Sequence, residues 1–338
     1  MTQSLKHSMP YSTIGTNISN FKPAFGLANR HVQTVYATLF RKLFPINYKI
    51  ETFRLDDGDF IECYYSNIKN NTQSTPFVIL FHGLAGSYKS PYINGAVKSL
   101  NEAGFNTVIM HYRGTSGKEN NLARSYHSGD TSDALSFISF LKSRYPKAKL
   151  YAVAYSLGAN MLLKLLGEKG LNSKLEAAVC VSAPMQLDIC ADSMNKGFSR
   201  LYQTNLLKDL KVSLDKKYDK HDMQSLIAFK RKDIKNLKTF WEFDDAYTAP
   251  IHGFSSAKDY YTSSSSKQFL KDIKTPTLII HSLDDPFMTS EVLPKENEVS
   301  KYVTLEISEK GGHVGFISGS FFKPQYWLEK RILKFFIS

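Results

Sequence analysis

The sequence predicts an α/β protein built on a mostly parallel sheet with helices on both faces. Three observations predict this class: a hairpin pattern near the N-terminus, short continuous apolar runs after it, and amphipathic segments between those runs. Parallel strands that are buried on both faces appear as continuous apolar runs, not as alternating ones. Strands that alternate with helices indicate a single α/β domain, not two independent halves.

The N-terminal region is expected to hold a polar tail, a helix and the hairpin. Residues 1–24 form the polar N-terminal tail. Apolar residues recur at helical spacing over Phe25–Phe44, and Pro45 ends the pattern. The segments Lys49–Leu55 and Asp59–Tyr65 flank an Asp-Asp-Gly turn in which glycine supplies the positive φ angle.

Six apolar runs follow, and with the hairpin they predict a sheet of about eight strands. The expected strands are Pro76–Phe81, Asn106–Met110, Leu150–Ala154, Ala177–Ser182, Thr277–His281 and Tyr302–Ile307. The expected helices are Tyr92–Ala103, Asp130–Arg144, Leu157–Glu168 and a final one near Pro324–Phe336. A long, largely helical insertion at about residues 184–273 interrupts the series. We expect it to form a cap on a single domain that spans residues 25–338.

The composition is that of a folded protein with a core of its own. The chain is 42% hydrophobic and 13% aromatic. Its three cysteines, Cys63, Cys180 and Cys190, are too few and too scattered for a disulfide framework. The N-terminus has no apolar core of a signal peptide, and no run approaches the ~18 apolar residues of a membrane helix. We therefore expect a cytoplasmic location.

The chain is basic, with 43 Lys and Arg against 31 Asp and Glu, a formal net charge of +12. Part of the excess is local, because Lys196–Lys238 holds twelve Lys or Arg and five Asp, a net of +7. Such a run most often forms a solvated helical face. It also permits weak peripheral contact between the basic cap and an anionic membrane. We expect no nucleic-acid partner.

A serine lies at a junction of strand, turn and helix. An apolar strand and the helix-forming run MLLKLLGEK enclose Ala154-Tyr155-Ser156-Leu157-Gly158. This is the context of a nucleophile elbow, in which small residues two before and two after the serine let strand and helix approach closely. The structural alternative is a serine that only caps a helix. The motifs upstream and downstream favour a nucleophile.

The upstream motif is a glycine-rich loop, HGLAGS, which follows the strand that ends at Phe81. In a fold with a nucleophile elbow, this loop gives one backbone N–H of the oxyanion hole, and the residue after the nucleophile gives the other. Leu84 and Leu157 are therefore the expected donors. The loop fits neither glycine-rich phosphate-binding pattern, so phosphate binding is disfavoured.

The downstream motifs supply an acid and a base. The strand that ends at His281 leads to Asp284 and Asp285, and the last strand leads to Gly-Gly-His313. The order Ser, Asp, His is that of the α/β-hydrolase fold, where the histidine takes the serine proton and the acid orients the histidine. Adjacent residues of an extended segment point in opposite directions, so only one aspartate can face His313.

Two further groups have open interpretations. Arg113 is either a structural anchor of its loop or a grip for a substrate carboxylate. Five apolar residues of the insertion either line an acyl channel or pack in a core: Phe198, Leu201, Tyr202, Leu206 and Phe229. The histidines form no i,i+4 pair with a suitably placed glutamate, so we expect no metal site.

Nine segments carry a more specific likeness: GLANRHVQT (Gly26–Thr34), HGLAGS (His82–Ser87), HYRGTSG (His111–Gly117), YHSGDTSD (Tyr126–Asp133), AYSLGAN (Ala154–Asn160), FDDAYTAPIHGF (Phe243–Phe254), DYY (Asp259–Tyr261), LDDPFM (Leu283–Met288) and GGHVGF (Gly311–Phe316). With them the chain resembles the YheT-like subfamily of α/β-hydrolases, relatives of the yeast medium-chain ester synthase/esterases. The likeness covers nearly the whole chain from Phe25 onward. The family has glycine where this chain has Ala154 and Ala159.

The resemblance implies a serine esterase that acts on short- to medium-chain acyl esters, including lipid esters, and needs no cofactor. It favours Asp285 as the acid, so the expected catalytic residues are Ser156, Asp285 and His313. Asp284 would then cap or brace its loop. Two alternatives stay open. One is an acyltransferase that passes the acyl group to an alcohol, and the other is a scaffold with the fold but little activity.

Overall fold

The computed structural model describes residues 16–67 and 74–337, and within them nine strands form one sheet. The strand order is β1-β9-β8-β7-β6-β4-β5-β3-β2. Only the pairs β2–β3 and β3–β5 are antiparallel. The strands are β1 (Thr16–Ile18), β2 (Lys49–Arg54), β3 (Phe60–Ser66), β4 (Phe77–Phe81), β5 (Asn106–Met110), β6 (Leu150–Tyr155), β7 (Ala177–Val181), β8 (Thr277–Ser282) and β9 (Val303–Ser308). A separate hairpin pairs β10 (Ile317–Gly319) with β11 (Pro324–Tyr326).

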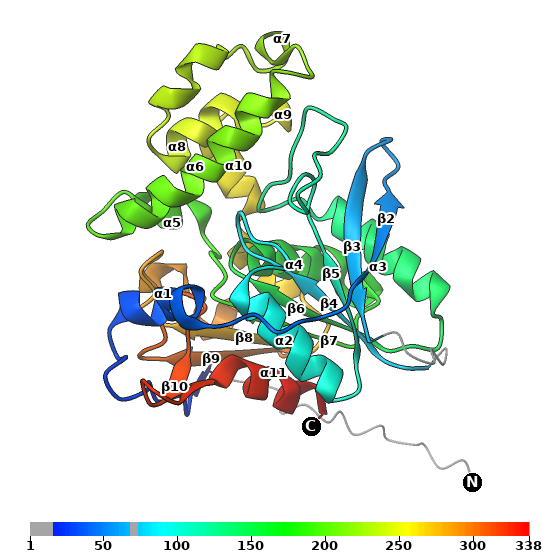
Figure 1. The fold of residues 1–338 in the computed structure, drawn as a ribbon, viewed down its shortest axis with the longest axis vertical. Coiled ribbons are helices and arrows are strands. Elements are labelled where there is room, and N and C mark those ends of the chain that lie inside the picture. The colour runs from blue at the N-terminus through cyan, green and yellow to red at the C-terminus, as the bar shows by residue number, and fades with distance from the viewer. Residues whose placement is uncertain (1–15, 68–73, 338) are drawn as a thin grey trace.

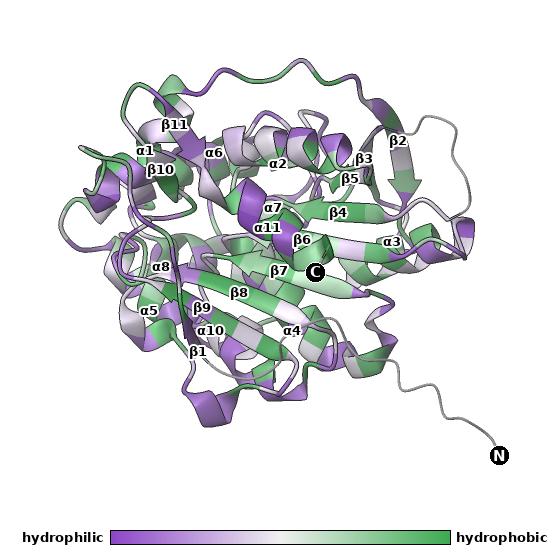
Figure 2. Ribbon diagram, turned by 90° about the horizontal axis from the view of Figure 1, so that it is seen from below, coloured by the Kyte–Doolittle hydropathy of each residue, from purple (hydrophilic) through white to green (hydrophobic). Residues whose placement is uncertain are grey.

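Helices cover both faces of the sheet, as Figure 1 shows. On one face α3 (Ser132–Arg144) and α4 (Leu157–Lys169) pack on the sheet, and on the other α2 (Pro91–Glu102) and α11 (Trp327–Ile337) do so. Successive residues of β4 enter the two opposite cores in turn, since strand side chains alternate in direction. The central strands are therefore apolar along their whole length (Figure 2).

The helices between β7 and β8 rise above the carboxyl ends of the strands, and we call this segment the cap (Figure 1). Its helices are α5 (Leu187–Met194), α6 (Ser199–Lys217), α7 (Met223–Ile227), α8 (Phe240–Phe243), α9 (Ala249–Ile251) and α10 (Ala257–Ser264), with a π-helical turn at Asp244–Thr248. The cap has an apolar cluster of its own, around α6 and α7. None of the helices in the described residues has the length and apolar character needed to cross a bilayer.

The N-terminal region differs from the sequence-based expectation. Residues 1–15 of the expected tail lie outside the described part of the chain. Thr16–Ile18, however, form β1, an edge strand parallel to β9, and the Ser19 N–H continues the pairing to the Ile307 carbonyl at 2.8 Å. A strand of three residues held by backbone hydrogen bonds leaves no apolar periodicity in the sequence, so pattern analysis could not detect it.

The first helix, α1 (Arg30–Phe40), is shorter than the predicted Phe25–Phe44. It begins at Arg30 because the Asn29 side chain accepts hydrogen bonds from the N–H groups of His31 and Val32. At the other end of the chain, the predicted final helix begins at Trp327, because the three residues before it pair with β10.

Candidate active site

Ser156 lies at the turn between β6 and α4, with φ at 52° and ψ at −121°. A positive φ is strained for a residue with a side chain, and it exposes the serine hydroxyl at the top of the sheet. The Ser156 N–H donates to the Val181 carbonyl at 2.9 Å, which ties the turn to β7. A Cβ at Gly158 would lie 2.6 Å from the His82 carbonyl oxygen, so the close approach of α4 requires glycine there. Ala154 is fully buried two residues before the serine, and its methyl group fits.

The loop after β4 lies against Ser156, since a Cβ at Gly83 would be 3.1 Å from Ser156 Cβ, and it holds a backbone donor without an acceptor among the described residues. The N–H groups of Gly83 and Ala85 each donate at 3.0 Å, to the hydroxyls of Tyr92 and Tyr126 respectively. Burial raises the pKa of Tyr126 to about 12, so this phenol stays neutral. The intervening Leu84 N–H has no acceptor within the described chain. The Leu84 and Leu157 residues both line the cavity in front of Ser156.

A buried histidine holds the same loop. His82 Nδ1 lies 2.8 Å from the Gly83 carbonyl oxygen, and Nε2 lies 3.1 Å from the Thr115 hydroxyl. Burial lowers the pKa of His82 to about 4, so the ring is neutral near pH 7. Its Nδ1–H therefore donates to the carbonyl. His82 fixes the loop and does not act as a base.

His313 connects the serine to an aspartate. Its Nε2 lies 2.8 Å from Ser156 Oγ, and its Nδ1 lies 2.8 Å from Asp285 Oδ2. Because an ionised carboxylate only accepts hydrogen bonds, the Nδ1 atom carries the proton and Nε2 is free to accept from the serine hydroxyl. Asp285 is fully buried, and its second oxygen accepts the Phe287 N–H at 2.8 Å. These three residues come from the ends of β6, β8 and β9.

The neighbouring Asp284 has a different set of contacts. Its Oδ1 accepts the Gly312 N–H at 2.9 Å, and its Oδ2 lies 3.9 Å from Lys310 Nζ. It therefore joins the loop that carries His313 to the loop after β8, without contact to the imidazole. Both contacts fit a loop brace.

Helix α1 contributes contacts that the sequence analysis missed. Arg30 donates to the Asp285 carbonyl oxygen. The Thr34 hydroxyl accepts the His313 N–H at 2.9 Å and donates to the Arg30 carbonyl at 2.8 Å. The buried Gln33 bonds both the N–H and the carbonyl of Ile317, just after the His313 loop. The GLANRHVQT segment was recognised as a motif, but no pattern in the sequence paired it with residues about 250 positions away.

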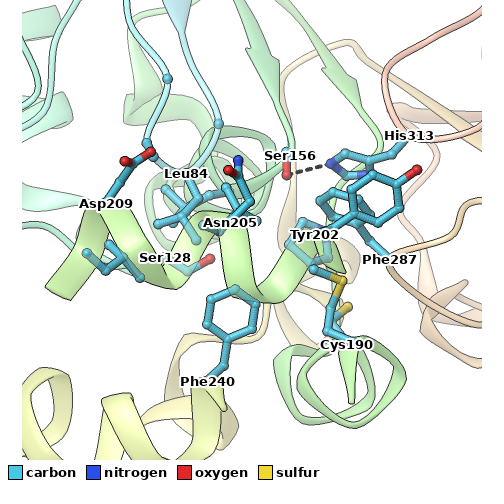
Figure 3. Close-up of a pocket in the computed structure, with 18 of the residues that line it drawn as sticks. Leu84, Ser128, Ser156, Cys190, Tyr202, Asn205, Asp209, Phe240, Phe287 and His313 are labelled. Carbon is cyan, nitrogen blue, oxygen red and sulfur yellow. Dashed lines mark hydrogen bonds between the residues drawn. The ribbon is translucent and has the colours of Figure 1, made fainter. Parts of the chain in front are cut away.

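A cavity of about 750 Å³ opens in front of Ser156, between the sheet edge, α1 and the cap. Figure 3 shows Ser156 and His313 at one end and Cys190 and Phe240 of the cap at the other. The Phe287 ring stacks on His313, with centroids 3.9 Å apart and planes at 10°. Tyr202 of α6 also packs on Phe287, with ring centroids 5.1 Å apart, so the cap reaches His313 through one aromatic ring.

The five residues for which an acyl channel was one interpretation lie in different places. Tyr202 and Leu206 line the cavity. Phe198 and Leu201 do not, and they are 54% and 60% exposed, while Phe229 packs against the apolar cluster of the cap. The acyl-channel interpretation is therefore wrong for these three residues. The sequence of α6 is polar on most sides, so its inner face could not be identified in advance.

Arg113 is a structural anchor. Its guanidinium donates to both oxygens of Asp133 at 2.7 Å and to Asp59 at 2.9 Å, and it also pairs with Asp57. All of these contacts hold its side chain within the fold, although the residue borders the cavity. Three carboxylates already engage the guanidinium, so the structure favours the structural anchor over the alternative, a grip on a substrate carboxylate.

Among the described residues, the cavity has one cysteine in its lining and no cluster of metal ligands. Cys190 lines the cavity, but burial raises the pKa of its thiol far above the usual value, so it stays protonated. Within the same part of the chain, no three His, Cys, Asp or Glu side chains group as metal ligands do.

Known proteins share this architecture and much of this sequence. A family model described as alpha/beta hydrolase fold matches residues 76–320. The Escherichia coli (strain K12) protein named "Putative esterase YheT" is 42% identical over 314 residues, which cover 93% of this chain and 92% of that protein. Medium-chain fatty acid ethyl ester synthase/esterase 2 of Saccharomyces cerevisiae is 31% identical over 284 residues, 77% of this chain and 62% of the yeast protein.

A solved structure supports the fold independently of close sequence similarity. The esterase Pf2001 of Pyrococcus furiosus superposes with a TM-score of 0.57 at 16% identity, and the match covers 98% of each chain. At this identity the likeness concerns the fold alone.

Proposed function

The chain belongs to the α/β-hydrolase family and to its YheT-like branch, and from this premise we propose that it hydrolyses short- to medium-chain acyl esters through Ser156, His313 and Asp285. The observation that carries the proposal is the unbroken hydrogen-bond chain from the Ser156 hydroxyl through His313 to Asp285. The esterase names of the relatives support the same reaction class.

The reaction has two steps. His313 Nε2 takes the proton of Ser156 as Oγ attacks the ester carbonyl, and the backbone N–H groups of Leu84 and Leu157 stabilise the oxyanion. Asp285 stabilises the imidazolium, which then protonates the leaving alcohol. Water activated by the same histidine releases the acid from the acyl-enzyme. The side chains present supply every proton transfer, so the mechanism needs no cofactor.

The cavity supports an ester of small or medium size. Its volume of about 750 Å³ falls within the ~300–1,000 Å³ of small-molecule sites. Leu84, Leu187, Leu206 and Met288 give it apolar walls that suit an acyl chain. We therefore expect kcat/KM for p-nitrophenyl esters to be highest for butanoate to octanoate and to decrease for hexadecanoate.

Ser156→Ala tests the nucleophile. The variant should fold as the wild type does, because the side chain is small and its backbone hydrogen bonds remain. It should lose fluorophosphonate labelling and at least about 10³-fold in kcat, since only an activated serine does both. Peptide mapping of the labelled wild type identifies the modified residue. Labelling of Ser156→Ala at the wild-type rate would refute the assignment.

The acceptor of the acyl group is the remaining question, since the yeast relative is named as both synthase and esterase. Water is present at about 55 M, so transfer to an alcohol needs a bound alcohol with a high effective concentration. We expect free acid as the main product in dilute buffer, with ester appearing only as ethanol is raised. New ester as the main product at millimolar ethanol would make the chain an acyltransferase.

A further inference from the structure

Five large apolar side chains are exposed together beside α1. Phe25 and Phe322 are each 91% exposed, Leu39 is 67%, Phe40 is 63% and Phe321 is 46% exposed. They come from the segment before α1, the C-terminal end of α1 and the loop between β10 and β11. We call these five residues the α1 surface. Isolated exposed apolar residues are common, but a contiguous group indicates an interaction site.

Packing holds the α1 surface together. The ring centroids of Phe40 and Phe321 lie 6.3 Å apart, and those of Phe321 and Phe322 lie 5.3 Å apart. The Tyr36 hydroxyl donates to the Phe321 carbonyl at 2.8 Å, which fixes the hairpin loop to the helix. Phe25 forms a β-bridge with the residue before Phe321. Figure 2 shows α1 beside β10, in agreement with the Tyr36 hydrogen bond. Ring contacts therefore join Phe40, Phe321 and Phe322, and the backbone of Phe25 is tied to the same hairpin.

The α1 surface is continuous with the mouth of the cavity. Thr34, Thr38 and Leu39 of α1 line the cavity in front of Ser156. Leu39 belongs to both the lining and the exposed group. One helix thus separates the catalytic serine from the exposed apolar face. An acyl chain that enters over this rim stays in contact with apolar side chains along its path.

The charges around the α1 surface are of one sign. The first fifty residues of the chain contain no Asp or Glu. Lys22, Lys42 and Lys323 flank the apolar group, are exposed, and make no ion pair within the described chain. The nearby acid, Glu329, is already paired with the buried Arg41 at 2.6 Å. Exposed aromatic residues bordered by free lysines match a lipid surface that carries negative charge.

We propose that the α1 surface docks this protein on anionic lipid surfaces, with the aromatic side chains in the headgroup layer and the lysines on the lipid phosphates. The docking itself does not depend on the proposed ester hydrolysis. Only its biological role does, which is to bring a poorly soluble ester to the mouth of the cavity. A second copy of the chain fits the same face less well, because a two-fold interface would bring equal positive charges together.

Sedimentation of the whole chain with vesicles tests the docking. We expect binding to phosphatidylcholine vesicles with about a third phosphatidylglycerol to be at least about tenfold tighter than to phosphatidylcholine alone. The double variant Phe25→Ser/Phe322→Ser should weaken binding to the anionic vesicles about tenfold or more. Lys42→Gln/Lys323→Gln should remove most of the preference for anionic lipid. Neither pair lines the cavity, so hydrolysis of soluble p-nitrophenyl butanoate should be unchanged.

Matched controls separate this surface from others. Leu171→Ser removes an apolar side chain that is 82% exposed in the 3₁₀ turn after α4 (Gly170–Ser173), and it should not change vesicle binding. The double variant Lys230→Gln/Lys232→Gln removes two positive charges from the basic cap, as many as Lys42→Gln/Lys323→Gln removes from the α1 surface. Binding that depends on the cap pair and not on Lys42/Lys323 would place the membrane contact on the cap and overturn the proposal. So would a wild type that does not bind anionic vesicles at all.

Two further outcomes are distinguishable. A dimer in size-exclusion chromatography that Phe25→Ser/Phe322→Ser dissociates would assign the α1 surface to a second copy. A wild type that binds vesicles but does not hydrolyse soluble esters would refute the proposed function and leave the docking proposal in place.

Discussion

The carboxyl edge of the sheet and the cap line the same cavity, but they are built in different ways. At the sheet edge each functional group follows a strand by a few residues and is fixed by backbone hydrogen bonds, as Ser156 is to β7. The cap contributes side chains from helices that have their own core, such as Tyr202 and Leu206 of α6. The difference indicates that the proposed chemistry belongs to the sheet edge and that the cap shapes the space around it.

The strongest test of this division uses the adjacent aspartates at the sheet edge. Asp285→Asn should lower kcat by about 10³ or more, because the amide NH2 can donate to His313 Nδ1, which favours the wrong tautomer, and the amide carries no charge to stabilise the imidazolium. Asp284→Asn should cost only about tenfold, since it loosens the His313 loop through Gly312 without touching the ring. Steady-state kinetics of the two purified variants measures this ranking, and circular dichroism spectra that match the wild type show that both variants are folded. The reverse ranking would move the acid role to Asp284.

A weaker effect is expected where the two regions meet. Phe287 stacks on His313 at 3.9 Å and favours the imidazolium that forms during attack. Phe287→Leu should therefore lower kcat about threefold to tenfold with little change in KM. Phe198→Leu is the matched control, because Phe198 contacts Tyr202 and His31 of the same aromatic group but not His313. If both variants lower kcat equally, the cap takes part in the chemistry.

The sequence was sufficient for the α/β-hydrolase fold, which the family match confirms. It also identified the residues that the structure brings together at Ser156, although their catalytic roles stay predictions until the variants are measured. This was achievable because each motif is local: a strand, a tight turn and a polar residue within ten positions. The glycine requirement at Gly158 follows from the same local geometry.

The parts that the sequence did not reveal depend on distant contacts. Thr34 and His313 are separated by 279 residues, and no periodicity connects them. The orientation of α6 was also undetermined, because polar residues surround it, and of its leucines Leu201 is 60% exposed while Leu206 lines the cavity. The edge strand β1 is too short for a pattern. Tertiary packing decided these features.

The smallest expected effect lies in the cap, at Asp244, which lines the cavity and accepts a hydrogen bond from the Tyr261 hydroxyl at 2.6 Å. Burial raises the pKa of Asp244 to about 6, against ~3.9 for an Asp in an unfolded chain. Below about pH 4 the carboxyl is protonated in both states, so the shift costs nothing. Between about pH 4 and pH 6 the unfolded chain ionises this carboxyl while burial keeps it protonated in the folded state, so the free energy of unfolding decreases over that range and is constant above it.

Asp244→Asn keeps an acceptor for Tyr261 but carries no charge. Its Tm should exceed that of the wild type by about 2 °C at pH 8 and by about half as much at pH 5. Calorimetry at both pH values measures the difference, while kcat should change less than twofold because Asp244 takes no part in the proposed chemistry. A variant that is less stable at pH 8 would show that the carboxylate is stabilised by the cap. A variant that loses activity would place a catalytic group outside the sheet edge, and the division between the two regions would fail.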